Sequence, residues 1–343
     1  MTSFHASRRT FLAGLGAAAA GLPSTFAVGQ SHEKVTFGTS WVAQAEHGGY
    51  YQAFADGTYA KHGLDVTIIP GGPQANNRMQ VMLGRIDFYM DANLNQAFSA
   101  VEQDIPTVII AAIFQKDPQV LIAHPGQGIE TFEDLKKLPT LFISKEGVAS
   151  YFQWLKADYG FRDNQVKLYN FNPQPFLADK RSAMQGYVTS EPYSIEQKAG
   201  FKPKVFLLSD QGYDTYASTI ETHKQLVIER PQTVQRFVEA SIIGWYNYIY
   251  GDNAAANTLI KKDNPELSDA SIAFAIAQMK EYGIVDSGCS LDLGIGAITE
   301  GRVENFFSKM VKAGVQKPTT DWRRAIDTRF VNKGVGKELR KAG

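Results

Sequence analysis

The chain has 343 residues, and its 35 basic and 35 acidic side chains give a formal net charge of zero. Hydrophobic residues make up 44% and charged residues 20% of the chain, a balance that builds a sizeable core, and the length suits two lobes. Apart from a short basic tail, no run of like charges stands out, which excludes an electrostatic footprint for nucleic acid. The single cysteine, Cys289, excludes an intrachain disulfide and a cysteine zinc cluster.

The first thirty residues have the pattern of an export signal. The pair Arg8-Arg9 precedes Phe11 and a run of Ala, Gly and Leu over residues 13–20, and small residues follow near Ala27. This order is typical of a signal for the twin-arginine route. We therefore expect residues 1–30 to be a leader and the mature protein to be soluble and periplasmic where the cell has two membranes.

The first part of the mature chain alternates strands and helices. Strands are expected at 35–39, 66–69, 86–90 and 107–114, and helices at 50–61 and around 79–83. Strand–helix–strand order predicts a doubly wound α/β lobe with a mainly parallel sheet. The apolar segment 119–124 is expected to begin the crossing to a second lobe.

The second part repeats this strand–helix pattern before the chain returns. Strands are expected at 140–143, 166–170, 186–189 and 205–208, and helices from 131, at 150–159 and at 176–184. Residues 213–220 are expected to return the chain to the first lobe, where amphipathic helices follow at 231–250, 268–282 and 301–313. The predicted organisation is lobe 1 from residues 31–122 and 217–343, and lobe 2 from residues 123–216.

Several short motifs together resemble one group of importer-linked binding proteins. They are the segment Trp41–His47, Gly63-Leu64-Asp65-Val66, Gly71-Gly72-Pro73, Gly84-Arg85-Ile86-Asp87 and Glu191-Pro192-Tyr193. The group includes sulfonate, nitrate and taurine binders and binders of thiamine-pyrimidine precursors. Over roughly residues 34–315 the sequence looks most like the pyrimidine-precursor binders of bacterial thiamine salvage, which are similar to the fungal thiamine-pyrimidine synthase.

This resemblance implies a type II periplasmic binding protein fold, with two lobes and two hinge crossings. It implies a monomer without cofactor that captures a small molecule and delivers it to an ABC transporter permease. The fungal synthase has a cysteine-rich stretch and donates its own histidine. No cysteine occurs near Tyr213–His223 here, which disfavours an enzyme. His47 stands where the synthase has its histidine, and we interpret it as a pocket donor or acceptor.

Ligands of open α/β lobes lie beyond the carboxyl ends of the strands, so residues that follow strands are the candidate ligand contacts. These candidates are Ser40, Trp41, His47, Asp91, Asn93, Lys145, Tyr151, Glu191, Tyr193, Tyr213 and Tyr216.

The candidate set is aromatic, with few polar groups. Trp41 and a tyrosine can sandwich a planar ring, and Glu191 can accept N–H bonds from an aminopyrimidine edge, while Asn93 offers both donors and an acceptor. This chemistry favours a heteroaromatic ligand. Three alternatives stay open: an organic anion held near Lys145, a flavin, and an enzyme related to the pyrimidine synthase.

Overall fold

The computed structural model describes residues 32–340. The leader expected over residues 1–30 lies outside this range and stays a prediction. Within the range, no helix combines the length and the hydropathy that a membrane span requires.

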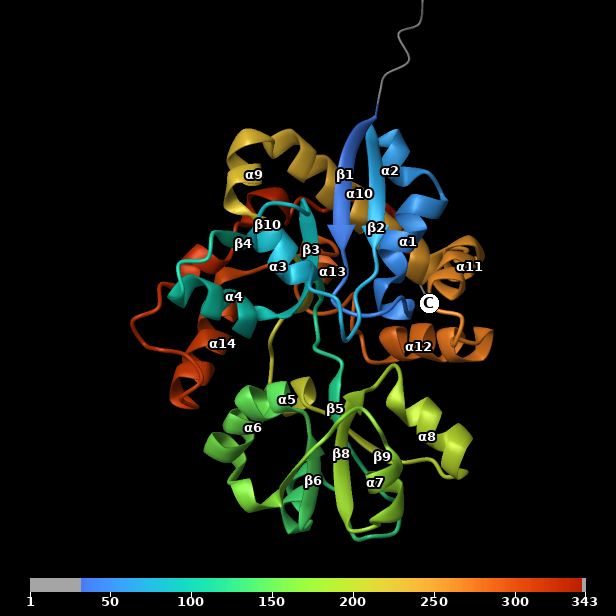
Figure 1. The fold of residues 1–343 in the computed structure, drawn as a ribbon, viewed down its shortest axis with the longest axis vertical. Helices are drawn as coiled ribbons and strands as arrows, with labels where there is room; N and C mark the ends of the chain where they lie inside the picture. The colour runs from blue at the N-terminus through green and yellow to red at the C-terminus, as the bar shows by residue number, and fades with distance from the viewer. Residues whose placement is uncertain (1–31, 341–343) are drawn as a thin grey trace, which may run out of the picture. The chain divides into compact units, whose positions relative to one another are not determined.

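The first lobe is built on a five-stranded sheet. Its strands are β1 (Glu33–Gly38), β2 (Leu64–Ile69), β3 (Phe88–Asn93), β4 (Thr107–Phe114) and β10 (Ala217–His223). The strand order is β2-β1-β3-β10-β4, with β1 parallel to β2 and β3, and β10 antiparallel to β3 and β4. Figure 1 shows this sheet in the upper half of the view, with the second sheet below it.

The second lobe is built on a sheet of the same design. Its strands are β5 (Gln119–Ala123), β6 (Thr140–Ile143), β7 (Val166–Leu168), β8 (Ser182–Tyr187) and β9 (Lys204–Leu207). The strand order is β7-β6-β8-β5-β9, with β6 parallel to β7 and β8, and β5 antiparallel to β8 and β9. Each sheet is therefore mainly parallel, as predicted, and also carries one reversed strand in the fourth position.

The reversed strand of each sheet is the one through which the chain enters that lobe. Residues 115–118 lead into β5, and residues 208–216 lead back into β10. The boundary expected at residue 122 falls inside β5, which lies wholly in the second sheet, so the first crossing comes earlier. These features are those of the two-lobe α/β fold with two crossings that the sequence predicted.

Helices surround both sheets. In the first lobe they are α1 (Gly48–Ala55), α2 (Thr58–Lys61), α3 (Asn77–Met82), α4 (Leu94–Glu102), α9 (Lys224–Glu229), α10 (Pro231–Tyr250), α11 (Ala254–Asp263), α12 (Asp269–Glu281), α13 (Ser290–Leu293) and α14 (Glu300–Lys312). In the second lobe they are α5 (Lys145–Ala149), α6 (Tyr151–Trp154), α7 (Gln174–Ala178) and α8 (Glu191–Ala199). Short 3-10 or π turns are η1 (Ala45–His47), η2 (Phe132–Lys137), η3 (Leu155–Tyr159), η4 (Asp163–Gln165), η5 (Ser209–Gln211), η6 (Trp322–Ala325), η7 (Thr328–Phe330) and η8 (Lys337–Leu339).

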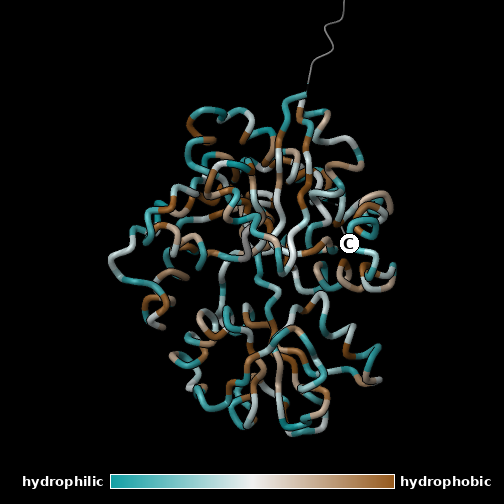
Figure 2. Tube along the Cα trace, viewed as in Figure 1, coloured by the Kyte–Doolittle hydropathy of each residue, from teal (hydrophilic) through white to brown (hydrophobic). Residues whose placement is uncertain are grey.

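Hydrophobic residues of the strands and of α10 form the core, and Figure 2 shows hydrophobic segments along the strands of both sheets. Strand β4 is buried over its whole length, as expected for a strand covered on both faces. Helix α10 packs through Phe237, whose ring stacks on Phe88 with the centroids 4.0 Å apart. The core therefore holds the first lobe together around one long helix.

Several elements differ from the sequence prediction, including the unpredicted helices α8, α9 and α11. The helix expected at 176–184 is wrong, because α7 ends at Ala178 and β8 begins at Ser182. Strand β8 is buried along most of its length, but its sequence Ser-Ala-Met-Gln-Gly-Tyr mixes small, polar and apolar residues without the alternation of a half-buried strand, so periodicity gives no strand signal there. Helix α4 was missed, although Leu94, Ala97, Phe98 and Val101 follow helical spacing and are buried.

Candidate ligand-binding site

The loops that follow β1 and β8 face each other across the two lobes. The Thr189 hydroxyl, just after β8, donates a hydrogen bond to the carboxylate of Glu46 in η1. Two ring contacts also join the lobes: Trp41 to Phe171 at 5.6 Å between centroids, and Tyr193 to Phe274 at 5.3 Å. The carboxyl ends of both sheets thus meet at one region, where the strand rule places a ligand.

Phe171 is an aromatic residue that the sequence analysis did not single out. Its side chain is 57% exposed, and its ring contacts Trp41 of the opposite lobe at a tilt of 41°. Its backbone is in the left-handed region at φ 58°, which is costly for a bulky residue and is found most often at functional sites. The loop between β7 and α7 therefore holds this ring towards Trp41.

Three carboxyl groups act electrostatically on Tyr187 in this region and are called the acidic cluster: Glu46, Asp117 of the first crossing, and Glu191 at the start of α8. Burial raises the pKa of Glu46, raises that of Asp117 to about 6, and, with repulsion from Glu46, raises that of Glu191 to about 7. The pKa of the Tyr187 phenol is raised as well, mainly by burial and also by electrostatic repulsion from the three carboxyls. The three carboxyls therefore lie within electrostatic range of one side chain.

The acidic cluster is held by hydrogen bonds instead of ion pairs. Asp117 accepts from the backbone N–H of Gln119 at 3.0 Å, and Glu191 accepts from that of Tyr187 at 2.6 Å. Among the described residues, no lysine, arginine or histidine lies within ion-pair distance of these carboxyls. Buried carboxylates ordinarily pair with a cationic side chain. The acidic cluster therefore suits a bound ligand that donates hydrogen bonds to it.

Two predicted tyrosines lie next to the acidic cluster. Tyr151 donates to the side-chain oxygen of Gln185 at 2.9 Å, and Tyr213 accepts from the amide of Asn95 at 2.9 Å. Their rings meet edge to face, with centroids 6.2 Å apart. Asn95 comes from the first lobe and Tyr151 from the second, and Tyr213 of the return crossing connects them.

His47 is fully buried at the end of η1, and neither ring nitrogen has a hydrogen-bond partner among the described residues. Burial lowers the pKa of His47 to about 3, so its imidazole is neutral near pH 7. A neutral imidazole carries one donor and one acceptor. His47 can therefore still donate or accept a hydrogen bond, which is the role that the sequence analysis expected for it.

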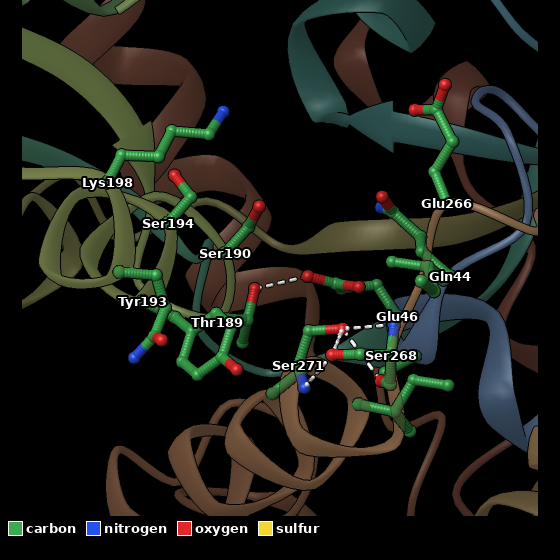
Figure 3. Close-up of a pocket in the computed structure, with 15 residues that line it drawn as sticks. Gln44, Glu46, Thr189, Ser190, Tyr193, Ser194, Lys198, Glu266, Ser268 and Ser271 are labelled. Carbon is green, nitrogen blue, oxygen red and sulfur yellow. Dashed lines mark hydrogen bonds between the residues drawn. The ribbon is translucent and has the colours of Figure 1, made fainter.

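A cavity of about 280 Å³ opens beside Glu46 and Thr189 (Figure 3). The first lobe lines it with Gln44 and with residues 266–275 around the start of α12. The second lobe lines it with residues 189–198, which include Ser190 and Tyr193. Tyr193, a predicted site residue, thus faces a cavity shared by the two lobes.

Other predicted site residues have other surroundings. Asn93 caps α4, where its side-chain oxygen accepts from the N–H of Asn95 at 3.1 Å. Lys145 is exposed at the start of α5, and Ser40 is half-buried after β1. Tyr216 is buried in the first lobe against the guanidinium of Arg302, 4.1 Å from its ring centroid.

Asp91 lies on β3 opposite Thr219 of β10, and its side chain is outside the described part of the structure.

Glu46, Asp117, Phe171 and Thr189 were missed by the sequence analysis. Two of them adjoin residues that it considered, since Glu46 precedes His47 and Thr189 precedes Ser190. The strand rule covered those two loops and could have included them. Asp117 lies before a strand, on the crossing, where that rule does not apply.

The comparisons with known proteins support the two-lobe fold. The riboflavin-binding protein RibY of Chloroflexus aurantiacus is 22% identical in an alignment of 318 residues that covers 88% of this chain and 87% of that protein. The periplasmic aliphatic sulphonate binding protein SsuA from Escherichia coli superposes with a TM-score of 0.65 at 12% identity, over 87% of this chain and 93% of SsuA.

The desulfurization enzyme DSZB has the same fold, with a TM-score of 0.56 at 12% identity over 90% of this chain and all of that one. Binding proteins and an enzyme therefore share this architecture, which is the periplasmic binding protein fold.

A model of the family described as NMT1/THI5 like matches residues 44–256. The matched segment runs from the η1 loop through the whole second lobe to α11, and so includes the acidic cluster, Phe171 and the return crossing. It spans more than half of the chain, and the protein belongs to the NMT1/THI5 like family.

Proposed function

We propose that the protein is the extracytoplasmic binding component of an ABC importer and captures a small heteroaromatic with N–H groups between its lobes. The observation that carries this proposal is the acidic cluster. Among the described residues, no cationic side chain pairs with its three carboxyls. A ligand with N–H donors satisfies these carboxyls, and closure of the lobes around it excludes water. The leader expected at residues 1–30 supports an extracytoplasmic site of action.

The aromatic pair Trp41 and Phe171 supports a planar ligand. Their centroids are 5.6 Å apart, so a slight opening of the lobes admits a flat ring between them. Both an aminopyrimidine and a flavin fit this chemistry, and RibY is named for a flavin.

A sulfonate or another organic anion fits the region less well. An anion near Glu46 or Glu191 is repelled by these carboxylates, and Lys145, its expected partner, is exposed on α5 without a described ion-pair partner. We therefore propose a heteroaromatic ligand and no catalytic turnover. A pyridoxal-dependent relative of the pyrimidine synthase would show a Schiff-base absorbance band with pyridoxal phosphate, and we expect none.

The test is a thermal-shift screen of refolded, ligand-stripped protein against aminopyrimidines, thiamine, flavins, sulfonates, taurine, nitrate and aromatic carboxylates. A ligand that binds only the folded state raises the Tm. We expect a shift with a heteroaromatic and none with the anions. For the ligand found, Trp41→Ala and Phe171→Ala should each weaken binding about tenfold in calorimetry, because each removes one stacking face.

Phe54→Ala is the matched control, because Phe54 is a similarly exposed phenylalanine (49%) on α1. Shifts with anions alone would overturn the proposal and favour the organic-anion alternative.

A further inference from the structure

The cavity beside Glu46 and Thr189 is smaller than most pockets that enclose a whole drug-sized ligand such as a flavin. Its volume is about 280 Å³, and pockets that enclose an entire drug-sized molecule usually measure roughly 300–1,000 Å³. Glu46 belongs both to the acidic cluster and to the cavity wall. A ligand held at the acidic cluster can therefore extend one substituent into this cavity.

The polar groups of the cavity are mainly neutral. Gln44, half-buried on one lobe, and Ser190, exposed on the other, have side chains without a hydrogen-bond partner among the described residues, and the hydroxyl of the half-buried Tyr193 has none either. Figure 3 shows Gln44 and Ser190 on either side of the Glu46–Thr189 hydrogen bond. Free donors and acceptors thus come from both lobes.

The charged groups of the cavity do not favour an ionic substituent. Glu46 is engaged by Thr189, and the two remaining charged residues, Lys198 and Glu266, are exposed and of opposite sign. The apolar part of the wall comes from the Tyr193 ring, Leu267 and Ile272. Neutral hydroxyls and amides beside an apolar wall suit a ligand substituent that carries both hydroxyl groups and apolar C–H groups.

We propose that this cavity is a subsite for a polyhydroxylated chain carried by the heteroaromatic ligand, as in riboflavin. This inference rests on the proposed function and narrows it to a ring that bears a neutral polyol substituent. Gln44 and Ser190 are the specificity-determining residues, since each offers an unused polar group from a different lobe.

The test compares riboflavin with lumiflavin, which has the same ring system and a methyl group in place of the polyol chain. Affinities are measured by fluorescence quenching of the flavin. We expect the wild-type protein to bind riboflavin at least about tenfold more tightly than lumiflavin, as for two added neutral hydrogen bonds. In the double variant Gln44→Met with Ser190→Ala, this ratio should fall towards one while the lumiflavin affinity stays unchanged.

A variant that does not fold loses its affinity for lumiflavin as well as for riboflavin. An unchanged lumiflavin affinity therefore shows that the fold and the ring site are intact. Gln103→Met is the matched control, because Gln103 is exposed at the end of α4 and lies outside the cavity. Equal wild-type affinities for both flavins would overturn the subsite.

Two further outcomes separate this inference from the function on which it rests. Binding of aminopyrimidines without riboflavin overturns the subsite and leaves the proposed function standing. Binding of no heteroaromatic overturns both.

Discussion

At the scale of single residues, the proposed site contains carboxyls that are harder to ionise than usual. Glu191 shows this most clearly, because burial and repulsion from Glu46 raise its pKa to about 7. Its side chain also accepts the backbone N–H of Tyr187. A group so placed is partly protonated near neutral pH, and can both donate to and accept from a heteroaromatic edge.

We predict that Glu191 makes the stability of the ligand-free protein fall as pH rises. Its pKa is about 7 in the folded protein against an ordinary value of 4.5, so the folded state binds more protons between these limits. The favourable contribution is present below pH 4.5 and is lost by pH 7. The Tm of wild type minus that of Glu191→Gln should therefore decrease across this window, by the equivalent of about 2–3 kcal/mol.

Calorimetric scans at several pH values between 4.5 and 7.5 measure this difference. Glu196→Gln is the control, since Glu196 is exposed on the same helix. A difference that stays constant with pH would contradict the shifted pKa of Glu191.

At the scale of elements, α1 and α10 pack closely where they cross. Gly49 lies against the ring of Trp245, where an added Cβ would be 2.2 Å from the nearest ring atom. Gly244 lies against the backbone oxygen of Gly49, where an added Cβ would be 2.3 Å away. This contact places η1, with Glu46 and His47, at the mouth of the lobe, because η1 runs directly into α1.

Gly244→Ala should destabilise the protein by about 3 kcal/mol or more, because the new methyl group meets backbone that cannot move aside easily. Urea unfolding with an unchanged slope measures the loss. Gly301→Ala in α14 is the control: its Cβ meets nothing within 4 Å, so it should stabilise by about 0.5–1 kcal/mol. Equal stability of the two variants would show that the helix crossing adapts.

At the scale of the whole molecule, contacts at several places join the two lobes, among them the ion pair of Lys312 in α14 with Asp158 in η3 and the Tyr193–Phe274 ring contact. The crossings at 115–118 and 208–216 connect the two sheets. The Glu46–Thr189 hydrogen bond and the Trp41–Phe171 ring contact join the lobes on the cleft side. We therefore regard the Glu46–Thr189 pair as a latch between the lobes.

Thr189→Val removes the latch hydrogen bond and keeps the shape of the side chain. We expect a larger open population of the ligand-free protein and about tenfold weaker ligand binding, as for one lost hydrogen bond. Pulsed electron resonance can measure the distance between spin labels at Ile228→Cys and Leu168→Cys, which are exposed on different lobes, in a Cys289→Ser background.

Thr258→Val, which changes a threonine within α11, is the control. An unchanged distance distribution in Thr189→Val would show that the latch does not hold the lobes.

The sequence by itself determined the elements whose hydrophobic pattern and end signals agree. Strands Thr107–Phe114 and Thr140–Ile143 and helix Pro231–Tyr250 have the predicted bounds, and the alternation of strands and helices predicted two α/β lobes. The strand rule also placed Trp41 and Tyr193 at the meeting of the lobes. These features depend on local spacing and on topology, which can be read along the chain.

Only the tertiary structure decided which groups share the site. The partnership of Glu46 with Thr189 joins residues 143 positions apart, and the raised pKa of Asp117 depends on burial where the crossing meets both lobes. Phe171 faces Trp41 because its backbone takes a left-handed conformation, which no residue type in that loop announces. The burial of these side chains and their contacts between the lobes depend on how distant segments pack together. The spacing of residues along the chain does not predict them.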